Sequence, residues 1–369
     1  MRRLKTLTLI AVMTVAATAA AAAPSADDYR RLNLDLVDHH ILPRYVRLAD
    51  AAAALERSTE GYCTTPMGTT PAELDQAWQT TVDAWQSAQH LRFGPVELFM
   101  RGMRIAFWPD PRNSVGRQLD ELLASGDPAA LEPDRFAHGS IATQGLPAFE
   151  RLLHDATPAR SDADRAFRCA AMQAIAHNVA DMTAGMLSDW RDGNDGFREI
   201  IRRAGEPGVH YHTPREATLD LFKSLHAALE VVADHKLKRP LGDSLQAARP
   251  QLAESWRSER SLDNVRLNLA AAEALYLGED PQSEGGFSHF VRTTAGDTAL
   301  DDLLRRAFKQ TRATAQSIGM PLERAVADPA ERRKVEKLAR EAAALKALLA
   351  QRLAPALGIP VGFNALDGD

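Results

Sequence analysis

The fold class follows from residues 161–190, which read SDADRAFRCAAMQAIAHNVADMTAGMLSDW. The large apolar residues of this stretch recur every three or four positions, a spacing that places them on one face of an α-helix. They are Met172, Ile175, Val179, Met182 and Met186. A helix of this length with a single apolar face has to pack against other helices.

A second stretch near the other end of the chain shows the same spacing. Its apolar residues are Val335, Leu338, Ala342, Leu345 and Leu349. Asp328-Pro329 supplies a helix cap followed by a proline in the first turn, and Thr213-Pro214 has the same form. Further helices are predicted over residues 27–57, 72–91, 113–125, 146–155, 214–238, 263–278 and 297–317.

Strand-like alternation is nearly absent, so we predict an all-α protein built of two packed antiparallel helical bundles. The chain is longer than one small hydrophobic core usually organises, which favours two subdomains. Three stretches lack a helical pattern, namely residues 94–116, 192–212 and 358–369. We place the boundary in the second of them, which gives bundles over residues 24–192 and 193–369.

The N-terminus has the pattern of a secretory signal. Basic residues within the first five positions precede an apolar run over residues 7–17 and an alanine tract over residues 19–23. The run is shorter than the roughly 20 residues that span a bilayer. No cysteine lies near the cleavage point. We therefore expect a Sec-type signal peptide over residues 1–23, without a lipid anchor, and a periplasmic mature protein that does not span the membrane.

Charge and cysteine content narrow the function further. Removal of Arg2, Arg3 and Lys5 with the signal, and of no acid, takes the formal net charge from -5 to -8. This acidity argues against a nucleic-acid partner. The two cysteines, Cys63 and Cys169, would lie in an oxidising compartment, where such a pair can form a disulfide. The alternative is two buried free thiols.

Glu150 and His154 are a candidate metal-binding pair. They lie four residues apart in the predicted helix 146–155, so they share a helix face. The spacing alone is also typical of a surface glutamate beside a partly buried histidine. No His-Glu-x-x-His, Gly-x-Ser-x-Gly, phosphate loop or dinucleotide fingerprint occurs in the chain.

A polar cluster surrounds the irregular stretch after residue 92. Charges of both signs alternate there with aromatic residues, and Arg92, Arg104 and Arg112 are suited to clamp a carboxylate or a phosphate. The alternative is a salt-bridge network that fixes a kinked helix pair. The candidate ligand-binding residues are Gln144, Glu150, Arg92, Glu97, Arg104 and Asp110.

Several blocks of the sequence, in this order, resemble the imelysin-like family. They are LPRY (42–45), WQSAQ (85–89), RFGPVE (92–97), FWPD (107–110), QGLPAFE (144–150) and GFNALDGD (362–369). The resemblance covers essentially the whole mature chain and includes one continuous region over residues 27–358. It implies an all-α fold of two helical bundles with a site between them.

The same resemblance implies a link to bacterial iron uptake and, from the name of its M75 peptidase group, proteolysis. The family signature is Gly-x-His-x-x-Glu, whereas this chain has Gly145, Pro147 and Glu150 in the matching positions. The missing imidazole is the ligand that would most readily hold a transition metal beside Glu150. His154 would replace it only if the helix turned both side chains to the same cavity.

We therefore expect a non-catalytic periplasmic binding protein linked to iron or metal uptake. Its partner would be a small-molecule or metal ligand, with iron or another divalent metal as the candidate cofactor, together with an envelope uptake system. The first alternative is a metallopeptidase of the imelysin type that uses Glu150 with a histidine. The second is a structural cell-envelope protein whose polar cluster is only an internal salt-bridge lattice, without a cavity.

Overall fold

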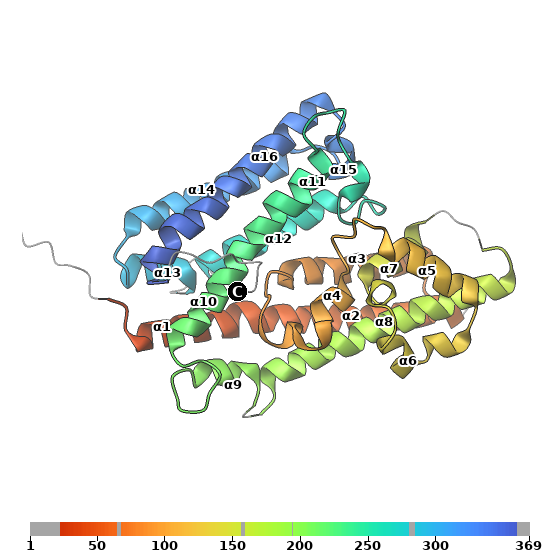
Figure 1. Cartoon of the computed structure of the whole chain (residues 1–369), viewed down its shortest axis with the longest axis horizontal. Helices are drawn as coiled ribbons and strands as arrows, with labels where there is room; N and C mark the ends of the chain where they lie inside the picture. Colours follow the sequence, from red (N-terminus) through yellow and green to blue (C-terminus); the bar gives the residue numbers. More distant parts are fainter. Residues whose placement is uncertain (1–22, 65–67, 156–158, 194, 280–284, 360–369) are drawn as a thin grey trace, which may run out of the picture.

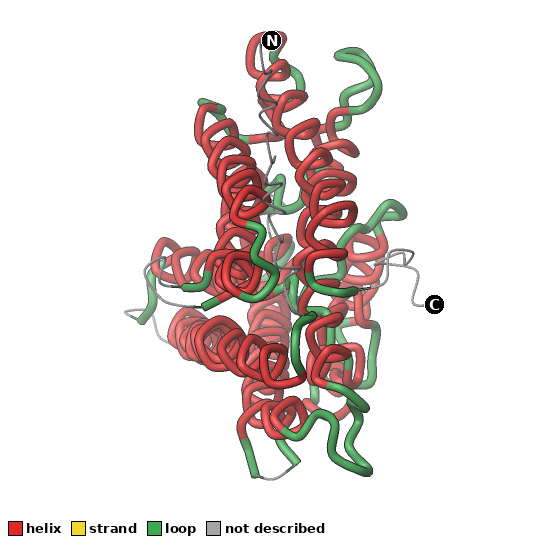
Figure 2. The backbone as a smooth tube through the Cα atoms, turned by 90° about the vertical axis from the view of Figure 1, so that its left-hand side faces the viewer, coloured by secondary structure: helices red, strands yellow, loops and turns green. Residues whose placement is uncertain are grey.

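A computed structural model describes residues 23–64, 68–155, 159–193, 195–279 and 285–359. Within these ranges every regular element is a helix, so the prediction of an all-α, helical-bundle protein is confirmed (Figure 2). The expected signal peptide, apart from Ala23, and the C-terminal GFNALDGD block lie outside the described residues. None of the described helices is long and apolar enough to cross a membrane.

The first group of helices is built around α2, which packs along both α8 and α3 (Figure 1). The helices of this group are α1 (Ala26–Asp35), α2 (Leu42–Thr64), α3 (Pro71–Ala88), α4 (Arg101–Ile105), α5 (Ser114–Ser125), α6 (Pro133–Ala137), α7 (Leu146–His154), α8 (Asp162–Arg191) and α9 (Phe197–Arg202). The long α8 carries the methionine-rich stripe, and all five of its predicted face residues are buried.

The second group places α12 against α10 and α14, with α16 packed along α14 and α10 (Figure 1). Its helices are α10 (Pro214–Glu230), α11 (Lys238–Leu241), α12 (Ser261–Leu277), α13 (Gly286–Thr293), α14 (Thr298–Ser317), α15 (Leu322–Ala325), α16 (Pro329–Leu348) and α17 (Ala354–Ala356). The groups meet where α1 contacts α10 and α3 contacts α12. The division at residues 192–213 stays a prediction.

The predicted helix starts are correct, but one of the two caps forms differently. Asp328 accepts hydrogen bonds from the backbone N–H groups of Ala330 and Glu331, both at 2.8 Å. The Thr213 side chain does not cap α10; instead Glu216 accepts from the backbone N–H of His212, at 2.7 Å. The start of α10 is therefore fixed by the carboxylate of Glu216, which binds the backbone one residue before Thr213.

Two segments that the sequence predicts as continuous helices contain a π-helical turn. The turns span Leu36–Ile41, between α1 and α2, and Val231–Leu237, after α10. Each wider turn changes the direction in which the following side chains point, and such turns are frequent at functional sites. The second turn holds Lys236, which contributes to the site described below.

Cys63 and Cys169 are joined by a disulfide. Their Cα atoms are 5.7 Å apart, within the usual range for such a bond. Cys63 lies near the end of α2 and Cys169 lies in α8, so the bond fastens the two longest helices of the first group to each other.

Candidate functional site

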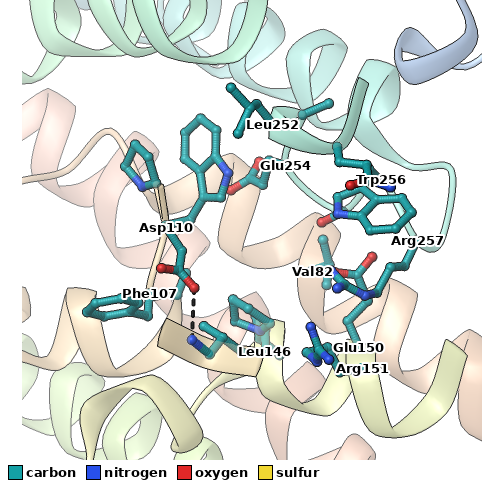
Figure 3. Close-up of a pocket in the computed structure, with 18 of the residues that line it drawn as sticks. Val82, Phe107, Asp110, Leu146, Glu150, Arg151, Leu252, Glu254, Trp256 and Arg257 are labelled. Carbon is teal, nitrogen blue, oxygen red and sulfur yellow. Dashed lines mark hydrogen bonds between the residues drawn. The ribbon is translucent and has the colours of Figure 1, made fainter. Parts of the chain in front are cut away.

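A cavity of about 380 Å³ lies between the two groups of helices, a volume typical of small-molecule sites. One side is formed by α3, by the loop 106–113 and by the first turns of α5 and α7. The other side is formed by Arg239 and by the segment 251–257, which precedes α12. Figure 3 shows Glu150 and Arg151 close to Trp256 and Arg257 on one side of this space.

Glu150 reaches the cavity because α7 begins unusually close to another backbone segment. A Cβ atom on Gly145 would overlap the carbonyl oxygens of Arg104 and Ile105, so this position has to be glycine. Pro147 lies in the first turn, where a missing N–H costs nothing. One helical turn later, Glu150 is only 4% exposed and lines the cavity.

The surroundings of the Glu150 carboxyl raise its pKa to near neutral pH. Its Oε1 accepts hydrogen bonds from the backbone N–H and the hydroxyl of Ser258, at 3.1 and 2.7 Å. Burial raises the pKa of Glu150 to about 7, against the lowering effect of Ser258 and of the Arg257 charge. The group therefore exchanges its proton near neutral pH, a property that clusters at functional sites.

Ser258→Ala tests this arrangement. Loss of the hydroxyl is expected to lower the free energy of unfolding by about 1–2 kcal/mol, because it leaves a buried carboxyl with one donor fewer. The pKa of Glu150 is expected to rise further. Urea unfolding at pH 6 and 8 measures the first effect and NMR titration measures the second. Ser188→Ala, which removes an exposed hydroxyl from Asp192, is the control and is expected to change little.

A buried ion pair lies at the edge of the cavity, and its acid, Glu254, lines the wall. Lys236 is 1% exposed and Glu254 is 7% exposed, and the Lys236 Nζ donates to Glu254 Oε2 at 2.6 Å. Gln86 and Asn264 each donate to the same Oε2 at 3.0 Å. Burial lowers the pKa of Lys236, and the Glu254 charge opposes this effect. Glu254 thus lines the cavity with one oxygen fully engaged by three donors.

Three arginines line the cavity, namely Arg151, Arg239 and Arg257. Arg257 and Arg151 both bind Asp155, with nitrogen–oxygen distances of 2.7 and 3.2 Å. Arg239 also lines the cavity and has no ion-pair partner among the described residues. The Nε of Arg151 is buried and has no hydrogen-bond partner among the residues that the structure describes.

Aromatic rings cover the remaining walls. Phe107, Trp108 and Trp256 line the cavity, together with two tryptophans of α3 (Figure 3). The guanidinium of Arg257 lies 4.4 Å from the centre of the Trp256 ring, and the Lys236 ammonium lies 5.8 Å from that of Trp108. Both contacts are in the range of cation–π interactions.

Of the six candidate ligand-binding residues, the structure brings Glu150 and Asp110 to this cavity. Asp110 accepts hydrogen bonds from the backbone N–H groups of Ser114 and Val115, both at 2.8 Å, so its carboxylate caps α5 (Figure 3). The two hydrogen bonds to the backbone therefore fix the position of the Asp110 carboxylate at the cavity.

The other four candidates lie elsewhere. Arg104 donates to the side chains of Gln144 and Asn178, at 2.6 and 2.9 Å, in a network behind α7. Gln144 in turn donates to three backbone carbonyls of residues 136–139 and is fully buried. Arg92 lines a separate small pocket of about 10 Å³, and Glu97 is exposed.

Glu150 and His154 have separate partners. Glu150 binds Ser258, whereas the His154 Nε2 lies 3.1 Å from Asp75 and its ring packs edge-on against Trp78, with centroids 5.2 Å apart. In the described ranges, no group of three or more histidine, cysteine or acidic side chains is arranged to hold a metal ion.

The sequence interpretation missed most of the cavity's polar residues. Lys236 resembles any charged residue of an amphipathic helix, and only the π-helical turn and the pairing with Glu254 reveal its burial. Trp256, Arg257 and Ser258 belong to a segment without a periodic pattern. The one usable signal was the pair Asn264 and Asn268, two polar residues at a helical spacing on the buried face of α12.

Comparison with known proteins shows which family the sequence matches. The sequence model of the imelysin family, peptidase M75, matches residues 41–351. Iron-regulated protein A of Synechococcus elongatus is 24% identical over 296 residues, which are 79% of this chain and 77% of that protein.

Two crystal structures share the fold. The first is an imelysin-like protein from Psychrobacter arcticum, with a TM-score of 0.72 and 21% identity, covering 93% of this chain and 99% of the other. The second, from Parabacteroides distasonis, is described as an iron-regulated protein A precursor; its TM-score is 0.72 at 16% identity, with coverage of 89% and 95%.

Proposed function

The chain belongs to the imelysin family, and we propose that it is a periplasmic binding protein with a role in iron uptake. The observation that carries this proposal is the cavity between the helical groups, into which a buried carboxyl of raised pKa points. The iron link is supported by the name of the Synechococcus relative. The envelope location is supported by the signal-like N-terminus and by the Parabacteroides protein being called a precursor.

The cavity favours this function over a purely structural role. A salt-bridge lattice without a ligand would fill its own interior, since protein interiors are close-packed. Here about 380 Å³ stays open although charged and aromatic side chains surround it. The aromatic walls of this space stay in contact with water until a ligand covers them, so a ligand gains affinity by burying their apolar surface.

The test uses the mature protein, purified under native conditions from the envelope of the cells that produce it, after growth with little iron. Native mass spectrometry and elemental analysis are expected to show a bound small molecule together with iron. Trp256→Ala removes one wall of the cavity and is expected to reduce the bound fraction at least tenfold. Tyr62→Ala, at an exposed aromatic residue of α2, is the control. Wild-type protein that carries neither a small molecule nor iron contradicts the proposal.

One observation supports the peptidase alternative, because a carboxyl that titrates near pH 7 is suited to act as a general base. Incubation of the same protein with an unfolded, carboxymethylated substrate distinguishes the two functions. Cleavage that a chelator stops and that Glu150→Gln abolishes would establish the peptidase. Intact substrate is the expected result.

A further inference from the structure

We propose that the ligand of this cavity is an organic anion with an aromatic body, whose charge is held by the arginines beside Glu150. This inference rests on the proposed function, since it names the class of molecule that the binding site would take. It is carried by the charges that line the cavity, by their partners and by the aromatic walls.

The arginines that line the cavity exceed the carboxylates that neutralise them. Arg151 and Arg257 share a single carboxylate, that of Asp155, and Arg239 has no ion-pair partner among the residues that the structure describes. The side chains of Arg151 and Arg257 are 15% and 19% exposed, so they are partly shielded from water. Guanidinium groups in such surroundings bind carboxylates and phosphates with good geometry.

The acids that line the cavity are not available to balance these cations. Glu254 is engaged by Lys236 and two amides, and Asp110 by the backbone at the start of α5. Glu150 is largely protonated below pH 7. The site therefore favours a negatively charged ligand and opposes a positively charged one.

The aromatic walls of the cavity favour a ligand with a flat apolar ring. Phe107, Trp108 and Trp256 present apolar rings to the same space, and the Trp256 ring already packs against the Arg257 guanidinium. A flat ring packs well in offset or edge-on contact with such side chains. An aromatic carboxylate or a similar anion would use both features, with its ring between the tryptophans and its charge at Arg257.

Glu150 makes the affinity for such an anion depend on pH. The charged groups that act on its carboxyl are Arg257 and Glu254, and Ser258 donates to it. An ionised Glu150 repels an anion held by Arg257, whereas a protonated Glu150 can donate a hydrogen bond to it. The affinity is therefore expected to rise as the pH falls through about 7, which is the pKa of this group.

Isothermal titration with three small probes tests the inference on metal-free, ligand-free mature protein. The probes share one catechol ring: 2,3-dihydroxybenzoate is anionic, catechol is neutral, and 3,4-dihydroxybenzylamine is cationic. The anion is expected to bind at least tenfold more tightly than either of the others, and more tightly at pH 6 than at pH 8. Arg257→Gln is expected to weaken its binding at least tenfold, and Glu150→Gln to abolish the difference between the two pH values.

Arg168→Gln is the matched control, because Arg168 also pairs with a carboxylate at 22% exposure but lies on α8, outside the cavity lining. It is expected to bind as the wild type does. Equal or tighter binding of the amine, or affinity for the anion that rises with pH, overturns the inference. So does the absence of binding by all three probes. None of these results affects the proposed function if protein from the native envelope carries a small molecule with iron.

Discussion

Replacing Lys236 by methionine is expected to lower the free energy of unfolding by about 3–5 kcal/mol at pH 7. Among the residues that the structure describes, the ammonium is the only charged donor to Glu254, and both groups are buried. Gln86 and Asn264 still donate to the carboxylate after the change, but neutral amides do not offset a buried negative charge. Urea unfolding of the mature protein measures the loss.

A double variant identifies the cause of this loss. If that cause is the unpaired charge on Glu254, removing this charge as well is expected to restore the stability. Lys236→Met combined with Glu254→Gln removes both charges and is expected to recover most of the stability. A single variant that is as stable as the wild type, or a double variant that is no more stable than the single one, would show that the pair is not a buried ion pair.

Replacing Glu150 by glutamine is expected to stabilise the protein at pH 8 by roughly 3 kcal/mol. The folded-state pKa is raised from 4.5 to about 7, so the folded protein holds the proton more tightly than the unfolded chain does. Stability is thus expected to fall as the pH rises from about 4.5 to about 7, and to stay low above it. Glutamine keeps an oxygen that accepts both hydrogen bonds from Ser258, without the charge.

Unfolding curves at pH 5 and pH 8 test this prediction. Wild type and Glu150→Gln are expected to differ little at pH 5 and to diverge at pH 8. Glu56→Gln, which changes an exposed carboxylate paired with His177, is the control and is expected to show no such divergence. A variant that is no more stable than the wild type at pH 8 would contradict the raised pKa. Retention of a carboxyl that destabilises the fold is typical of a residue that is kept for function.

The long helices could be predicted from the sequence because their apolar residues repeat at a helical spacing. The stripe from Met172 to Met186 is buried along its whole length, and the start of α16 at Asp328 follows from its cap and proline. The π-helical turns could not be predicted in the same way. A turn such as Val231–Leu237 keeps an apolar pattern that is also compatible with a regular helix.

The candidate site was predictable only where a residue carried its own signal. Glu150 is found by the glycine, proline and glutamate of its motif, since these residues reflect the close approach of α7 to another backbone segment. Gln144 and Arg104 looked equally suitable as polar residues, but they bind each other behind the helix. Which of several polar residues faces the open space depends on how the segment 251–257 docks on α3 and α7, and that contact is made between residues far apart in the sequence.

The central claim is that a ligand occupies the cavity beside Glu150, and the pKa of that residue is its most direct probe. It can be measured by NMR on protein that carries carbon-13 in the side-chain carboxyls of its glutamates. The protein is recovered from the envelope of its own cells and is measured twice, before and after the ligand is removed by unfolding and refolding. The ligand-free protein is expected to give a pKa of about 7 for Glu150, and the protein as recovered a higher one. A value that is the same in both samples would contradict the claim.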